Sequence, residues 1–242
     1  MNNYNLGLQN LNAVLGELGI LNGNLAGALQ TGYKKSGLSY GGSGATQVNS
    51  NLQYPDTNLT VSHTSIDFGQ GTITNTGEKT DYAINGGGFF LVQQVQDVGV
   101  NAPNLLTRDG GFHMGTVNGL GNILVTGNGL AVLRDTSGTG AGPFTTITQA
   151  DLDNGLRPSI VSPLDTNDSL AFSSHYGSKV FEFKGGLATG DGLLVEGALE
   201  ASNTGLAETM AAMSMHTKKF QAMAAEIKVE HSNIDTVLGL FK

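Results

Sequence analysis

The chain has 242 residues, with 36 Gly, no Cys, no Trp and a formal net charge of −8. The lack of Cys excludes disulfides and thiol chemistry, and the negative charge argues against a nucleic-acid backbone or an anionic membrane as the main partner. No apolar run approaches the roughly 20 residues that cross a bilayer, and the N-terminus lacks the pattern of a cleaved secretory signal, so we expect no membrane insertion and either a cytosolic location or export without such a signal.

A helix is predicted over residues 1–31. Its apolar residues recur at alternating steps of three and four, with Asn22 at one polar position of the stripe. The segment also contains several glycines, each of which costs about 1 kcal/mol relative to Ala inside a helix. We therefore expect a helix that needs packing partners to form, with an ordinary intramolecular helix pair as the alternative. The stripe consists of Leu8, Leu11, Leu15, Leu18 and Leu25.

The middle of the chain has a different pattern. Residues 32–59 are rich in Gly and Ser without a period, which predicts an extended linker. Residues 60–200 contain short apolar runs separated by Gly turns and predict a compact, mainly antiparallel β domain. Within it we expect one hairpin about Asp109 and Gly110, and a second about residues 127–129.

A long helix, free of Gly and Pro from Leu206 to Leu238, is predicted within the C-terminal segment 201–242. Its apolar residues follow a 3.5-residue repeat, interrupted by Thr217 and His231, which is typical of a coiled coil. Isolated polar residues of this kind can fix register, or they can simply be tolerated. The predicted fold class is therefore α+β, with the N- and C-terminal helices paired as a coiled coil and a central, mainly antiparallel β domain between them in the sequence. The predicted packing residues of this helix are Met210, Met213, Phe220, Ile227, Ile234 and Leu238.

Catalytic signals are weak. Residues 37–41, GLSYG, fit the pattern of a nucleophile elbow at Ser39, but that motif needs a preceding strand and a following helix, whereas this segment follows a helix and enters the predicted linker. The five His residues have no metal-ligand spacing. We predict no enzyme activity, no cofactor and no metal site.

Four ordered motifs resemble the bacterial flagellar rod and hook family. They are NLAGALQTGYK at residues 24–34, IDFGQGTITNTGEKTDYAINGGGFFLV at 66–92, LTRDGGFHM at 106–114 and GALEASNTGLAETMAAM at 197–213. The positions that carry the resemblance are Gly32, Tyr33, Gln70, Gly71, Gly86, Gly88, Phe89, Phe90, Arg108, Asp109, Gly110, Glu200, Ser202 and Asn203.

The resemblance implies a structural subunit that self-assembles into a helical tube, with the paired terminal helices lining a channel and the β domain outside. It implies a homo-oligomer that contacts other axial rod and hook proteins, and export by the flagellar type III apparatus without signal cleavage. The implied location is the flagellar basal body, spanning the periplasm, or the cell exterior. Length favours a rod protein; a separate extracellular flagellar-like fibre and a monomeric β-domain adhesin are the alternatives.

Overall fold

The computed structural model describes residues 2–49, 52–98, 104–164, 171–172 and 175–240. The chain forms two compact units. One, here the helical unit, comprises Met1–Ala28, Lys35–Phe68 and Thr204–Lys242; the other, the β unit, comprises Leu29–Lys34 and Gly69–Asn203. The predicted boundaries at residues 31/32 and 200/201 each lie three residues from a break, whereas 59/60 lies nine residues before the break at 68/69. The division into domains stays a prediction.

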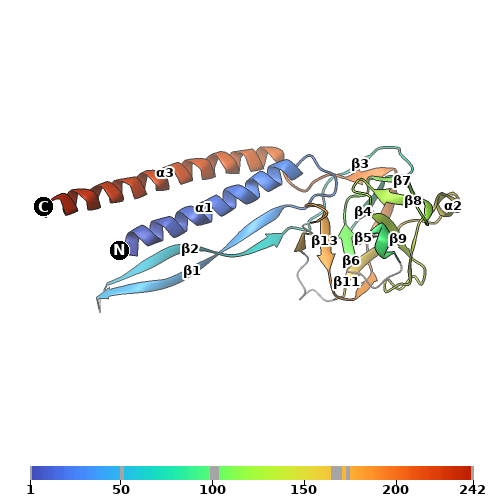
Figure 1. Ribbon diagram of the computed structural model, residues 1–242, viewed down its shortest axis with the longest axis horizontal. Coiled ribbons are helices and arrows are strands. Elements are labelled where there is room, and N and C mark those ends of the chain that lie inside the picture. The colour runs from blue at the N-terminus through green and yellow to red at the C-terminus, as the bar shows by residue number, and fades with distance from the viewer. Residues whose placement is uncertain (1, 50–51, 99–103, 165–170, 173–174, 241–242) are drawn as a thin grey trace. The chain divides into compact units, whose positions relative to one another are not determined.

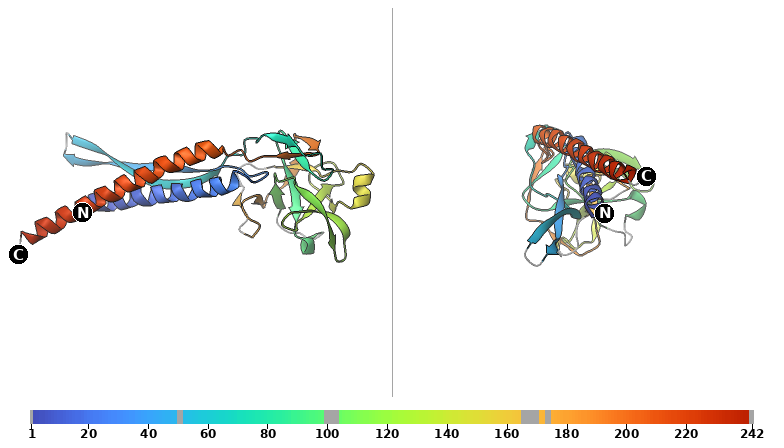
Figure 2. Two further views of the ribbon diagram at one scale, coloured as in Figure 1. Left: turned by 90° about the horizontal axis from the view of Figure 1, so that it is seen from above. Right: turned by 90° about the vertical axis from the view of Figure 1, so that its left-hand side faces the viewer.

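The helical unit contains two helices and a hairpin. α1 (Asn2–Gly27) packs against α3 (Leu206–Gly239) and against both strands of the hairpin, β1 (Ser36–Asn49) and β2 (Leu52–Ile66). Figures 1 and 2 show α1 alongside α3. The buried side chain of Asn24 fixes the end of α1 to the start of β1, because its Nδ2 donates to the Ser36 carbonyl at 2.7 Å and its Oδ1 accepts from the Ser36 N–H at 2.8 Å. The C-terminal helix predicted from Leu206 to Leu238 is confirmed.

Residues 32–59 do not form the predicted linker throughout. β1 and β2 pair in antiparallel register from Ser36↔Ile66 to Asn49↔Leu52, with three register shifts along the ladder. The Gly and Ser residues that suggested a linker therefore lie in paired strands. A hairpin is marginal by itself in water, so its packing against α1 explains why residues of low β propensity adopt this structure.

The β unit is built around an antiparallel sheet whose strands do not follow one another in chain order. Its main path through the described residues is β12-β13-β6-β5-β9-β8-β7, and every described strand pairing in the unit is antiparallel. These strands are β5 (Phe89–Gln93), β6 (Asn104–Thr107), β7 (Phe112–Val117), β8 (Gly121–Thr126), β9 (Ala131–Asp135), β12 (Ala171–Phe172) and β13 (Val180–Phe183). A mainly antiparallel β unit with helices at both ends of the chain confirms the α+β class.

Shorter elements complete the β unit. β10 (Phe144–Thr146) pairs with β9, and β11 (Ile160–Pro163) pairs with β5 and with β14 (Leu187–Thr189). Two separate pairs join β4 (Tyr82–Asn85) to β15 (Leu193–Glu196), and β3 (Ile73–Asn75) to β16 (Ala198–Glu200). A 3₁₀ turn, η1 (Val95–Asp97), follows β5. α2 (Gln149–Asp153) begins with a capping box, in which Thr148 and Asp151 satisfy each other's backbone N–H groups.

The core of the β unit lies around β4, β5, β8 and β9. Tyr82, Phe90 and Phe112 are buried together there, and the rings of Phe90 and Phe112 meet edge to face with centroids 5.1 Å apart. β5 is buried on both faces, because Phe89 packs against Phe181 on the side opposite Phe90. This double burial explains the uninterrupted apolar run FFLV.

The two predicted hairpins have different outcomes. The hairpin about residues 127–129 is confirmed: β8 pairs with β9, and Gly129 has φ +78°. The hairpin about Asp109 and Gly110 is wrong, since β6 pairs with β5 and β13 while β7 pairs with β8. Neither Asp109 nor Gly110 has the positive φ that a two-residue hairpin turn needs, and Gly110 packs against the Tyr82 carbonyl instead.

Candidate functional site

Glu200 is the centre of a buried ionic cluster in the β unit. It ends β16 and its side chain is fully buried. Oε1 accepts from Lys34 Nζ at 2.6 Å and from the Gly71 N–H at 2.8 Å, and Oε2 lies 3.3 Å from Nη1 of Arg108. Residues far apart in the sequence therefore meet on one carboxylate. We call Lys34, Arg108 and Glu200 the buried triad.

Arg108 connects the buried triad to the β4 segment. Its Nη2 donates to the Gly86 carbonyl at 2.7 Å, and its guanidinium lies 5.4 Å from the centre of the Phe89 ring. Burial lowers the pKa of Arg108, and the nearby Glu200 carboxylate partly offsets that shift. An Arg stays charged at any physiological pH, so its burial requires the partner that Glu200 supplies.

Lys34 is the second cation and is also fully buried. Besides Glu200, its ammonium donates to the Gly69 carbonyl at 2.8 Å. The segment around it is held by the backbone, since the Gly32 N–H donates to the Glu200 carbonyl at 2.8 Å. Two buried cations thus share one carboxylate and backbone carbonyls. Sequence reasoning did not select Lys34 as a site residue, although it lies in the first motif.

Gly32 and Asp109 fix a second contact between the first and third motifs. Gly32 has φ +67°, and a Cβ there would overlap the backbone of Arg108 and Asp109. The Asp109 carboxylate accepts from Thr31 Oγ1 at 2.6 Å and pairs with Lys179. Gly is therefore required at position 32 both by its φ and by this close approach.

Gln70 and Asn203 add polar contacts beside the triad. Gln70 Nε2 donates to the Ile84 carbonyl at 2.9 Å, and its Oε1 accepts from the Gly86 N–H at 3.0 Å. Asn203 donates through Nδ2 to the Gly69 carbonyl at 3.0 Å. The four motifs that carry the family resemblance thus converge on one polar cluster within the β unit.

The remaining motif residues serve packing. Tyr33 is buried, and Gly88 has φ +107° with β11 directly against it at Ile160. Phe89 and Phe90 lie on opposite faces of β5, as described above. Ser202 is half-buried at the turn that leads into α3.

The predicted packing residues of α1 are unevenly covered. Leu8, Leu11, Leu18 and Leu25 are half-buried, while Leu15 is 46% exposed. Ala13 and Val14, which lie off the predicted stripe, are buried apolar residues among the helix positions whose side chains are described, 7–27. The sequence analysis missed them because α1 packs against both α3 and the hairpin, which the 3.5-residue pattern alone cannot indicate.

α3 shows a similar division. Met213, Phe220 and Ile227 are half-buried, whereas Met210 is 57% and Ile234 48% exposed; the side chain of Leu238 lies outside the described part. The face that meets α1 also includes His216, whose Nδ1 lies 2.9 Å from Glu17 Oε2. Among the polar interruptions of the two stripes, Asn22, Thr217 and His231 are all exposed. The assignment of these residues to an assembly interface stays a prediction.

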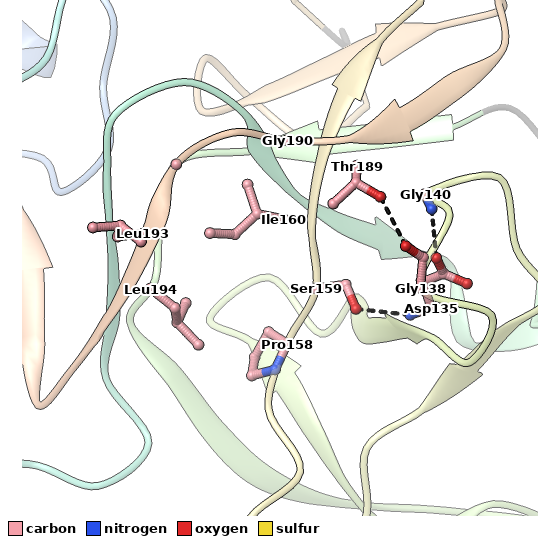
Figure 3. A pocket seen from close by; sticks show the side chains of 11 residues that line it. Asp135, Gly138, Gly140, Pro158, Ser159, Ile160, Thr189, Gly190, Leu193 and Leu194 are labelled. Carbon is pink, nitrogen blue, oxygen red and sulfur yellow. Dashed lines mark hydrogen bonds between the residues drawn. The ribbon is translucent and has the colours of Figure 1, made fainter.

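The β unit also has an open cavity of about 270 Å³. Figure 3 shows Asp135 at one side of it and Ile160, Leu193 and Leu194 at the other. Both carboxylate oxygens of Asp135 are already bonded: Oδ1 accepts from Ser137 N–H at 2.9 Å, and Oδ2 accepts from Gly140 N–H. Burial would raise the pKa of Asp135, but the hydrogen bond from Ser137 Oγ to Oδ1 at 2.8 Å, together with these backbone bonds, holds the pKa below its ordinary value. The carboxylate is thus a loop-stabilising group rather than a free acid.

Ser39 lies within β1, opposite His63 in the ladder, so the strand-turn-helix geometry of a nucleophile elbow is absent there. The described part of the chain contains no group of three or more His, Asp or Glu side chains placed to hold a metal ion. None of its helices combines the length and apolarity needed to span a membrane.

Comparison with known proteins gives one distant similarity that bears on function. No family model matches the chain. Over 110 residues it is 33% identical to the flagellar hook protein FlgE of Rhizobium meliloti (strain 1021). The match covers 44% of this chain and 24% of that hook protein, so the chain spans about a quarter of the length of this relative. The similarity supports the flagellar axial family that the motifs indicate.

Proposed function

We propose that the protein is a structural subunit that self-assembles into a helical tubular filament of the bacterial flagellar axial structure. In this proposal α1 and α3 form a coiled coil that lines the tube. The 33% identity to a flagellar hook protein and the four ordered motifs support a structural role rather than an enzymatic one. The buried triad keeps the motif segments together within each β unit.

The exposed apolar side chains of the terminal helices are the observation that carries this proposal. Leu15 of α1 and Met210 and Ile234 of α3 belong to the predicted 3.5-residue stripes, yet each is between 46% and 57% exposed in the single chain. Scattered exposed apolar residues are ordinary, but these continue stripes whose other described apolar members are half-buried. Neighbouring copies that cover them would bury the rest of each stripe.

The composition of α1 supports coupling between order and association. Five glycines lie within it, and each costs about 1 kcal/mol relative to Ala. Contacts with neighbouring subunits would offset that cost, so the subunit would stay soluble alone and order its ends when it joins a growing polymer. A contact that repeats head to tail without closing generates a helical filament.

The position of the subunit in the flagellum follows from the same family. We infer homo-oligomeric contacts, contacts with other axial rod and hook proteins, and export by the flagellar type III apparatus to the basal body or the cell exterior. Within the family we propose a rod protein, a choice that rests on the sequence resemblance, whereas the reported similarity is to a hook protein. A separate extracellular flagellar-like fibre is the alternative.

A matched pair of α3 variants tests whether the exposed apolar stripe of this helix is an assembly interface. Met210→Glu places a charge on the proposed assembly stripe, whereas Gln221→Glu adds the same charge at another exposed position of α3. We expect Met210→Glu to abolish sedimentable polymer and Gln221→Glu to retain it, with equal circular dichroism of the two dilute subunits. Equal polymer yields from both variants would contradict the proposed interface.

A further inference from the structure

Five Asn-Gly pairs occur in the sequence, and the structure separates one of them from the rest. They are Asn22-Gly23, Asn85-Gly86, Asn118-Gly119, Asn128-Gly129 and Asn154-Gly155. All five Asn side chains are exposed, so solvent access does not distinguish them. The pairs differ in whether the N–H of the following Gly donates a hydrogen bond.

Four of these Gly N–H groups are hydrogen-bonded. Gly86 donates to Gln70 Oε1 at 3.0 Å, Gly129 to the Thr126 carbonyl at 2.8 Å and Gly155 to the Leu152 carbonyl at 3.0 Å. Gly23 lies inside α1, where its N–H belongs to the helical hydrogen-bond series. The Asn128 side chain is held as well, because its Nδ2 donates to the Tyr176 carbonyl at 3.0 Å.

Gly119 differs from the other four. It lies in the three-residue connection between β7 and β8, whose ends pair as Val117↔Gly121. The turn hydrogen bond runs from the Leu120 N–H to the Val117 carbonyl at 3.2 Å, and within the described residues the Gly119 N–H has no acceptor. Gly119 has φ +89°, and a Cβ there would meet no atom within 4 Å, so the turn is open around this peptide.

A backbone N–H without an acceptor, next to an exposed Asn side chain, is the arrangement for intramolecular amide attack. We propose that Asn118 is a site of spontaneous deamidation in the folded protein. The Gly119 nitrogen loses its proton to solvent base and bonds to Asn118 Cγ, and the side-chain amide leaves as ammonia. Water then opens the resulting cyclic imide at either carbonyl, giving aspartate or isoaspartate, so the net reaction consumes one water and releases one ammonia.

The product changes an exposed turn of the β unit. Conversion of one Asn to a carboxylate takes the formal net charge from −8 to −9. The isoaspartyl product also adds a side-chain carbon to the backbone, between β7 and β8. The other four sites are protected while their elements stay folded, because breaking the Gly N–H hydrogen bond must precede the attack.

Peptide mass spectrometry of the intact, folded protein tests this assignment with an internal control. Trypsin cleavage after Arg108 and Arg134 gives one peptide that carries both Asn118 and Asn128. After incubation at mildly alkaline pH, fragment ions between the two residues report each site separately. We expect deamidation at Asn118 to exceed that at Asn128 by at least about five-fold in the folded protein, the factor that one hydrogen bond of ordinary net strength provides.

The same measurement in denaturant completes the test. In unfolded chain both Gly N–H groups are equivalent, so the ratio of the two rates is expected to fall towards one. Asn118→Gln removes the native-state product from this peptide and leaves Asn128 unchanged. Equal rates at Asn118 and Asn128 in the folded protein, or a ratio that denaturation does not alter, would overturn the proposal.

Discussion

Glu200 is the residue whose chemistry most constrains the β unit. It is fully buried and faces two buried cations, Lys34 and Arg108. Removing one member of a buried ion pair leaves an uncompensated charge, which typically costs about 3–5 kcal/mol. A triad of two cations and one anion is therefore most sensitive to loss of the anion.

We expect Glu200→Gln to destabilise the protein by at least about 3 kcal/mol in urea unfolding followed by circular dichroism. Lys34→Met is expected to cost less, because Glu200 keeps Arg108 and the Gly71 N–H as partners. Glu196→Gln is the matched control: Glu196 pairs with Arg157 at the surface, where such pairs contribute less than about 1 kcal/mol. Similar losses for the Glu200 and Glu196 variants would refute the importance of the triad.

Asp135 is a single residue that is expected to make the stability of the folded protein depend on pH. Its pKa in the folded protein is below the ordinary value of 3.8, so the folded state binds this proton less readily than the unfolded chain. The resulting stabilisation is present above pH 3.8 and is lost as the pH falls through the folded-state pKa.

Asp135→Asn replaces one carboxylate oxygen, both of which accept a backbone N–H, by an amide NH2 group, and it removes the titrating carboxylate. The difference in urea midpoint between wild type and variant should therefore be largest near neutral pH and shrink in acid. A difference that stays constant from neutral pH to well below pH 3.8 would contradict this role of Asp135.

At the scale of elements, the glycines of α1 separate contacts within one chain from contacts between copies. A Cβ at Gly7 would lie 3.2 Å from Ile227 Cγ1 of α3, whereas a Cβ at Gly19 would meet nothing within 4 Å. The structure of one chain therefore accounts for Gly7 but not for Gly19. A neighbouring helix that approaches closely in the polymer would account for Gly19.

Two Gly→Ala variants test this difference. Gly19→Ala should raise the helix content of the dilute subunit, because Ala favours a helix over Gly by about 1 kcal/mol, and yet impair polymerisation. Gly7→Ala should weaken the contact between α1 and α3 because Ile227 must move. If Gly19→Ala polymerises as well as wild type, no neighbour packs closely at that position.

The elements differ in how far the sequence could predict them. α3 was predictable because a Gly-free apolar repeat extends from Leu206 to Leu238, and the FFLV strand because β5 is buried on both faces. The β1–β2 hairpin was not predictable, since its Gly and Ser residues have low β propensity and its formation depends on packing against α1.

The polar cluster was predictable only in part. Family motifs selected Arg108 and Glu200, but no local pattern indicates that Lys34 joins them, because the three residues are brought together solely by tertiary structure. The wrong hairpin prediction at Asp109 also arose because tertiary contacts outweigh the local pattern. Its Asp-Gly pair is a strong local turn signal, yet Asp109 is used to bind Thr31 and Lys179.

At the scale of the whole molecule, the two units differ in how completely a single chain buries their apolar residues. The β unit has its own core and its own buried polar cluster, which hold the motif segments together. The helical unit retains exposed apolar residues on both helices, including Leu15, Met210 and Ile234. Under the proposed function, these exposed residues are the part of the chain that neighbouring copies would cover.

Electron microscopy of the purified protein over a range of concentrations, with and without preformed seeds, is the decisive test of the proposed self-assembly. We expect elongated tubes with a helical repeat, in which the terminal helices of neighbouring subunits lie side by side. Isolated particles under every condition, with α1 and α3 resistant to protease at concentrations where the protein is monomeric, would contradict it.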